Sequence, residues 1–207
     1  MTNLQKRILT SIIVLPLAIF FVLKGGYYLA SFLFLILLTG IYEVFSVFKK
    51  IKSIVFLSTT LILSLFFIYY LSDKAEHLLY FAIAVTISSD IGGYIFGNIF
   101  KWKKLTKISP KKTYSGVFGS YFFSIICLFA WTEFISPGTL VNLKTFIITI
   151  VFSTVAQIGD LIISYFKRLE KIKDTGKVLP GHGGIFDRID GLMFVVIVAT
   201  IYYHFNI

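Results

Sequence analysis

The sequence predicts an all-α fold: a polytopic transmembrane helical protein with about seven spans and a cytosolic N-terminus. Hydrophobic residues make up 57% of the 207 positions and charged residues only 14%, whereas soluble domains are about half apolar and a quarter charged. The apolar residues also form long uninterrupted runs, and a run of about 20 such residues crosses a bilayer as a helix. Runs of this length are too long for barrel strands, and helices satisfy their own backbone hydrogen bonds in lipid.

Seven apolar runs are long enough to cross a membrane. They cover residues 8–23, 26–48, 54–71, 78–100, 114–135, 144–166 and 189–205. The first run could pass for a secretory signal, but it ends in Lys24-Gly25-Gly26 without a small-residue cleavage pattern, which indicates a transmembrane helix.

Two parts of the chain are expected. Residues 1–77 hold the first three helices, and residues 78–207 form a second transmembrane region with the polar loops 101–113 and 167–188. The second part carries both loops and most of the acidic residues, so the candidate catalytic residues are expected there.

The positive charges predict the orientation. Seventeen of the 20 Lys and Arg residues fall in one set of segments between the runs, and only Lys24, Lys74 and Lys144 fall in the other. Segments rich in Lys and Arg stay in the cytosol, so both long polar loops are expected there. The net charge of +10 does not form a stripe on a soluble face, and no nucleic-acid partner is predicted.

Glu43, Asp90 and Asp160 lie within the apolar runs. Ionisable side chains are costly in a membrane, which makes each of them a candidate for a functional site. For Glu43 a second interpretation is open, in which Lys49 or Lys50 neutralises a carboxylate near the cytosolic end of the helix.

Asp160 belongs to a polar stripe. On a helix over residues 144–166, Gln157, Asp160, Ser164 and Lys167 recur at intervals of three and four and therefore face one side. One interhelical hydrogen bond would explain one polar residue, but four in register indicate a function.

The segment after this stripe is basic and rich in glycine. Lys167, Arg168 and Lys173 can bind phosphate oxygens, the guanidinium in a forked geometry. The turn around Gly183 and Gly184 lets backbone N–H groups approach an anion. Taken singly, a basic loop is often a topology signal and a Gly-Gly pair an ordinary turn.

Asp187 and Asp190 stand three residues apart at the start of the last run. Their side chains can point together and hold a hard cation such as Mg²⁺, although acidic residues at a helix start often only cap the helix. Because these acids, the basic loop and Asp160 occur within residues 160–190, the combination indicates a phosphate and metal site.

A second polar patch precedes the fifth run. Asp90 stands beside Gly93 and Gly97, whose GxxxG spacing also favours helix packing. The basic turn Lys111-Lys112 follows, and no P-loop pattern is present. Both interpretations of the glycines stay open, with packing glycines seating a functional aspartate.

Several of these motifs together resemble the signature of the bacterial phosphatidate cytidylyltransferases, also called CDP-diacylglycerol synthases. The motifs are Ser164-x-x-Lys167-Arg168, Lys173-Asp174, Leu179-Pro180-Gly181-His182-Gly183-Gly184 and Asp187-Arg188-x-Asp190. The resemblance covers roughly residues 157–191, and residues 90–116 look like a second conserved block of that family.

The resemblance implies roles for individual residues. It implies a metal site for Mg²⁺, with a monovalent cation such as K⁺, formed by Asp160, Asp187 and Asp190, with Asp90 as a possible addition. The residues expected to act in catalysis are Asp160, Asp187, Lys167, Arg168 and Lys173. The residues expected to bind substrate phosphates are Ser164, Lys111, Lys112, His182, Gly183, Gly184 and Arg188.

The reaction implied by the resemblance is transfer of a cytidylyl group from CTP to phosphatidic acid, giving CDP-diacylglycerol and pyrophosphate. The family resemblance further implies a homodimer in the bacterial inner membrane, with an active site open to the cytosol and to the lipid. The sequence departs from the family in having Tyr114-Ser115 after the Lys111-Lys112-Thr113 turn, where members usually have Trp-Glu. It is also shorter than typical members, so the resemblance does not predict the N-terminal architecture.

Other classes of protein are less compatible with these residues. A transporter for an anionic solute would bind near the bilayer midplane, whereas the four aspartates are expected at one cytosolic end. A CDP-alcohol phosphotransferase would show an Asp-Gly-x-x-Ala-Arg pattern, which is missing. A polyprenol kinase is a closer alternative, and a structural scaffold would not need the constellation of residues 157–190.

Overall fold

Seven α-helices make up most of the protein in the computed structural model, which describes residues 3–136, 141–176, 178 and 183–205. They are α1 (Asn3–Lys24), α2 (Gly26–Val47), α3 (Ile51–Lys74), α4 (Glu76–Phe100), α5 (Tyr114–Ala130), α6 (Leu143–Leu169) and α7 (Phe186–Phe205). A π-helical turn, Trp131–Ile135, extends α5. Each helix coincides with one of the seven apolar runs, so the all-α prediction is confirmed.

Six of the helices, α2 to α7, are long and apolar enough to cross a membrane, α5 together with its π-helical turn. The apolar part of α1, Ile12–Lys24, is shorter. The structure therefore has six candidate spans and one short apolar N-terminal helix where the sequence predicts about seven spans. The helices identify an integral membrane protein.

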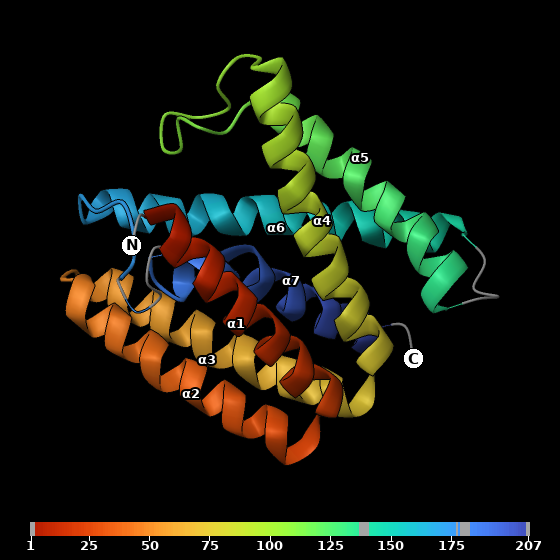
Figure 1. The fold of residues 1–207 in the computed structure, drawn as a ribbon, viewed down its shortest axis with the longest axis horizontal. Helices are drawn as coiled ribbons and strands as arrows, with labels where there is room; N and C mark the ends of the chain where they lie inside the picture. The colour runs from red at the N-terminus through yellow and green to blue at the C-terminus, as the bar shows by residue number, and fades with distance from the viewer. Residues whose placement is uncertain (1–2, 137–140, 177, 179–182, 206–207) are drawn as a thin grey trace.

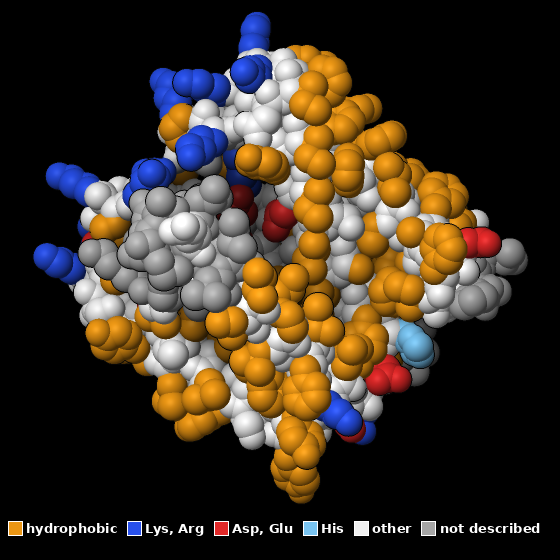
Figure 2. Space-filling view, viewed as in Figure 1, with side chains coloured by type: hydrophobic (Ala, Val, Ile, Leu, Met, Phe, Trp, Pro, Cys, Tyr) orange, Lys and Arg blue, Asp and Glu red, His pale blue; other side chains and the backbone are white. Residues whose placement is uncertain are grey.

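The surface of the bundle is largely apolar, as Figure 2 shows. Large side chains such as Tyr42, Phe66 and Phe122 are exposed on it, which is the arrangement expected where helices face lipid. The packed interior lies where α7 meets α3, α4 and α6, around side chains such as Phe152 and Met193 that are almost fully buried.

Helices α4 and α5 are the most closely packed pair, and glycines make the approach possible. A Cβ atom added at Gly92 would collide with the carbonyl oxygen of Gly119, and one at Gly119 would collide with that of Gly92. Gly93 lies against the Ser120 hydroxyl in the same interface. The predicted pair Gly93 and Gly97 faces Ser120 and Thr113 in this interface, but the closest approach is made by Gly92 and Gly119. Through this contact α4 holds Asp90 beside α5.

The polar loops gather at one end of the bundle. In Figure 1 the start of α1, the α2–α3 turn, the 101–113 loop and the segment after α6 lie on one side, and the C-terminus lies on the other. Hydrogen bonds join these segments. Glu170 accepts from the Lys50 N–H at 2.9 Å and from the Ser53 hydroxyl at 3.0 Å, and Arg168 Nε donates to the Ile108 carbonyl at 3.3 Å. This end of the bundle is called the loop end below.

Candidate active site

A cavity of about 540 Å³ opens at the loop end between α4, α5, α6 and the start of α7. Figure 2 shows acidic side chains inside a hollow whose rim carries basic side chains. The candidate residues that line the cavity are Asp90, Lys111, Lys112, Asp160, Ser164, Lys167, Arg168, Lys173, Asp187, Arg188 and Asp190. Gly183 and Gly184 lie just before α7, and His182 is outside the described residues.

The polar face of α6 forms one wall of the cavity. Gln157, Asp160, Ser164 and Lys167 all line it, because the helical repeat of 3.6 residues stacks them on one side. Ile163, between them in sequence, points the other way and is fully buried in the core. The predicted stripe is therefore a real surface of the folded protein.

The 101–113 loop brings Lys112 into the cavity. Backbone hydrogen bonds fold the loop back on itself, from Leu105 N–H to the Lys112 carbonyl at 2.8 Å and from Tyr114 N–H to the Lys103 carbonyl at 3.1 Å. Thr113 then caps α5, accepting from the Gly116 N–H at 3.1 Å. With its backbone fixed in this way, Lys112 reaches across to α6.

Lys112 and Asp160 form an ion pair, with Nζ 2.6 Å from Oδ2. The same ammonium donates to the Gln157 carbonyl at 3.2 Å, and the Ser164 hydroxyl donates to the other carboxylate oxygen of Asp160 at 3.3 Å. Both side chains of the pair remain partly exposed to the cavity, so a charged ligand entering it can reach either of them.

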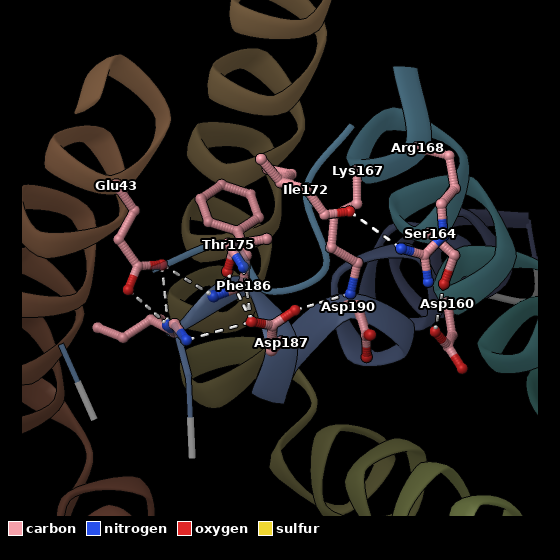
Figure 3. A network of polar contacts seen from close by, with 12 residues as sticks. Glu43, Asp160, Ser164, Lys167, Arg168, Ile172, Thr175, Phe186, Asp187 and Asp190 are labelled. Carbon is pink, nitrogen blue, oxygen red and sulfur yellow. Dashed lines mark hydrogen bonds and ion pairs between the residues drawn. The ribbon is translucent and has the colours of Figure 1, made fainter. Parts of the chain in front are cut away.

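Asp187 lies at the centre of a second network. Its Oδ1 accepts from Lys167 Nζ at 2.7 Å, and its Oδ2 accepts from the N–H of Thr175 at 2.8 Å, the hydroxyl of Thr175 at 3.0 Å and the N–H of Gly184 at 3.1 Å (Figure 3). A buried ion pair is tolerated when further hydrogen bonds satisfy its atoms, and this pair has three. The network fixes the direction of the carboxylate at the start of α7.

The glycine turn before α7 packs against this network. Gly183 has φ of +90°, a conformation that favours glycine, and an added Cβ would lie 2.9 Å from Asp187 Oδ2. The Gly184 N–H donates to Asp187. The turn therefore holds an aspartate in place, and a contact of these glycines with phosphate stays a prediction.

Four further aspartates line the cavity: Asp90, Asp160, Asp174 and Asp190. Asp90, Asp160 and Asp190 come from three different helices, α4, α6 and α7, and face the same cavity. In the part of the chain that the structure describes, no group of three or more His, Cys, Asp or Glu residues is arranged to hold a metal ion. Mg²⁺, however, is commonly bound by one or two carboxylates together with substrate phosphates and water, and these carboxylates fit that requirement.

Sequence reasoning missed one participant, Thr175. It is fully buried and gives Asp187 two of its hydrogen bonds, yet a threonine in a polar loop carries no distinctive signal. Glu43 was a candidate for a functional site because it lies within an apolar run. Its partners are backbone N–H groups just before and at the start of α7 rather than Lys49 or Lys50.

The fold and the cavity define an integral membrane protein with a mixed-charge site at one end of its helices. The particular family follows from sequence comparison: the chain belongs to the cytidylyltransferase family, whose profile matches residues 48–206. That range contains both polar loops and every described residue that lines the cavity.

Curated bacterial proteins are similar over part of the chain. A phosphatidate cytidylyltransferase of Staphylococcus epidermidis is 41% identical over 133 residues, which cover 63% of this chain and 51% of that protein. The phosphatidate cytidylyltransferase of Staphylococcus saprophyticus has the same identity and coverage. That of Staphylococcus aureus is 38% identical over 134 residues, covering 63% and 50%. The chain spans about half the length of the curated relatives it matches.

Proposed function

We propose that this protein transfers a cytidylyl group from CTP to phosphatidic acid, forming CDP-diacylglycerol and pyrophosphate in phospholipid biosynthesis. The observation that carries the proposal is the cavity, in which basic side chains of two separate loops surround five aspartates at one end of membrane helices. Membership of the cytidylyltransferase family supports a nucleotide as one substrate. The name of the staphylococcal relatives supports phosphatidic acid as the other.

The proposed chemistry is attack by a phosphate oxygen of phosphatidic acid on the α-phosphorus of CTP. The new P–O bond joins the lipid phosphate to the cytidylyl group, and the bond between the α- and β-phosphates breaks as pyrophosphate leaves. The attacking phosphate is already an anion, so a strong general base is not needed. The barrier comes chiefly from repulsion between two polyanions, which positioned cations reduce.

The basic side chains lining the cavity are suited to that task. Lys111 and Lys173 are exposed at its rim and can meet the triphosphate first. Lys167 is buried beside Asp187 and Lys112 stands beside Asp160, so these two ammonium groups can neutralise phosphate oxygens deeper in the site. Ser164 can donate a hydrogen bond in the same region.

The aspartates would hold Mg²⁺ at Asp160 and Asp187, with Asp190 in support and Asp90 as an additional candidate. When bound, the ion would neutralise triphosphate oxygens and charge that develops on the leaving pyrophosphate. A monovalent cation such as K⁺ is expected to accompany it. Like charges that line one cavity repel each other, and cations bound there would relieve that repulsion, which supports the assignment.

The lipid substrate would reach the site from the membrane. Tyr94, Val117 and Leu105 line the cavity beside the charged residues, and α4 and α5 expose apolar side chains around it. The acyl chains can then stay among the helices while the headgroup meets the cations. We expect the loop end to face the cytosol from the bacterial inner membrane, and the protein to act as a homodimer.

The decisive assay uses purified protein in detergent with phosphatidic acid, Mg²⁺ and CTP, and follows conversion of the lipid to CDP-diacylglycerol. Parallel reactions contain EDTA, or ATP, GTP or UTP in place of CTP. We expect product only with CTP, and none with EDTA. Folded protein that makes no product with any nucleotide would overturn the proposed function, and product in EDTA would overturn the metal assignment.

A further inference from the structure

Glu43 is a buried carboxylate on α2, outside the segment 48–206 that matches the family. Its side chain is only 1% exposed. Both of its oxygens accept from the Ile185 N–H at 2.9 Å, and one accepts from the Phe186 N–H at 3.4 Å (Figure 3). The first N–H groups of a helix lack partners within it, and a carboxylate there also complements the helix dipole. Glu43 therefore caps α7 from a different helix.

The same carboxylate also meets the other end of the loop that precedes α7. The Thr175 hydroxyl and the Glu43 carboxylate both lie against Gly184, where an added Cβ would collide with each of them. Gly176 and Gly184 both pack so closely that an added Cβ at either would lie within 3 Å of a Glu43 carboxylate atom, at 2.7 Å and 2.6 Å respectively. Glu43 thus occupies the point where the start and the end of the loop come together.

Two of these contacts are shared with Asp187. Thr175 donates to Asp187 from its N–H and its hydroxyl, and the same hydroxyl meets Glu43 across Gly184. The turn that donates to Glu43 through Ile185 donates to Asp187 through the neighbouring Gly184. A movement of Glu43 would therefore displace the groups that direct Asp187 towards Lys167.

We propose that Glu43 is a positioning residue for the active site. It holds Gly176, Gly184 and Ile185 at the start of α7 and so keeps Asp187 and Lys167 in the geometry that binds the metal and the triphosphate. The inference rests on the proposed function, in which those two residues act. The inference goes beyond the proposed function because it gives a role to a residue of α2, which lies outside the segment that matches the family.

The test compares Glu43→Gln and Glu43→Asp with a matched control, Glu170→Gln. Glu170 also accepts a backbone N–H and a hydroxyl at the loop end, but it does not line the cavity. Glutamine at position 43 keeps the size of the side chain, yet turns an NH₂ group towards N–H donors. Loss of a group that orients a metal ligand typically costs about 10–100-fold in activity or metal affinity.

We expect Glu43→Gln to lower kcat by about tenfold or more and to raise the Mg²⁺ concentration for half-maximal activity by a similar factor. The KM for phosphatidic acid should change less, Glu43→Asp should recover part of the loss, and Glu170→Gln should stay near the parent protein. Folded Glu43→Gln with kcat and Mg²⁺ dependence within about twofold of the parent would overturn the inference.

A second measurement separates this inference from the proposed function. Amide hydrogen exchange of the 170–186 segment, measured without substrate, should be faster in Glu43→Gln than in the parent and in Glu170→Gln. If the parent makes no CDP-diacylglycerol, the proposed function fails while exchange still judges the positioning role. Unchanged exchange would overturn that role.

Thr175→Val supplies the comparison should Glu43→Gln not fold. It removes the shared hydroxyl and keeps the N–H that donates to Asp187. We expect folded Thr175→Val to need several times more Mg²⁺, and an unchanged Mg²⁺ requirement would count against transmission from Glu43 to Asp187.

Discussion

Lys112 Nζ lies 2.6 Å from Asp160 Oδ2, and this ion pair joins the 101–113 loop to the polar face of α6. The two residues are far apart in the sequence and lie on different elements, so no local pattern predicts their contact. The contact depends on the backbone hydrogen bonds that fold the loop and on the glycine contact that draws α5 against α4. Packing of the helices therefore determines where the Lys112 charge lies inside the cavity.

Replacing Lys112 should weaken nucleotide binding. Lys112→Met removes a cation that faces both Asp160 and the proposed triphosphate, and a hydrogen bond to a charged group is worth about 1.5–3 kcal/mol. We expect the KM for CTP to rise about tenfold or more. Lys107→Met serves as the control, because Lys107 is on the same loop but does not line the cavity. Equal effects of the two substitutions would show that only the overall charge of the loop matters.

Replacing Asp160 should remove turnover without unfolding the protein. Asp160→Asn keeps the size of the side chain but lacks the charge that would hold Mg²⁺, and we expect kcat to fall about a hundredfold or more. Asp73→Asn is the control, since Asp73 pairs with Lys74 on an exposed surface away from the cavity. Near-normal turnover by folded Asp160→Asn would exclude Asp160 as a metal ligand.

The contact between α4 and α5 should be intolerant of added volume. Gly119→Ala would place a methyl group against the Gly92 carbonyl and the Phe96 side chain, and overpacking typically costs about 1–3 kcal/mol. We expect a lower Tm in detergent. Gly97→Ala is milder, because its added Cβ would lie 3.3 Å from the Thr113 hydroxyl, and its Tm should fall less. The reverse order would contradict the packing described.

Glu170 should make stability depend on pH. Desolvation raises the pKa of Glu170, but hydrogen bonds from the Lys50 N–H and the Ser53 hydroxyl outweigh it and hold the pKa below the ordinary value of 4.5. A carboxylate whose pKa is lower in the folded state stabilises the fold at pH values above its unfolded-state pKa. This contribution to stability is lost as the pH falls through the folded-state pKa. The Tm difference between the parent and Glu170→Gln should therefore be present at neutral pH and shrink in acid. A Tm difference that does not change with pH would contradict the role of the Glu170 charge in stability.

The orientation can be tested by labelling, because the sequence contains a single cysteine, Cys127. In a Cys127→Ser background, Lys103→Cys at the loop end and Lys74→Cys at the opposite end each supply one reactive thiol. An impermeant thiol reagent applied to intact cells should label position 74 and leave position 103 unlabelled until the cells are opened. The opposite pattern would place the loop end outside.

The helices could be predicted from the sequence because the membrane imposes a simple rule. Apolar runs of sufficient length become helices, and every run from 8–23 to 189–205 did so. The apolar part of α1 is shorter than the six candidate spans, so the length of the run alone did not decide whether this helix crosses the membrane. How the helices meet was less accessible, since the close approach at Gly92 and Gly119 depends on a pair of glycines on different helices.

Many of the charged residues that line the cavity could be selected from the sequence for a related reason. Charged residues are rare in this chain, so Asp160, Lys167 and the residues after them stood out against an apolar background. The partner of each charge was not predictable. That Asp187 pairs with Lys167 and is held by Thr175 follows from the path of the loop, which no local pattern encodes.

The cap of α7 by Glu43 has a consequence for the synthesis and membrane insertion of the protein. Glu43 enters the membrane with α2, and the N–H groups that satisfy it come 142 and 143 residues later in the chain. Until α7 is synthesised, the growing chain carries a carboxylate in α2 without those partners. Synthesis of α7 therefore supplies the partners of Glu43 and, in the same step, the aspartates at the start of α7 that line the cavity.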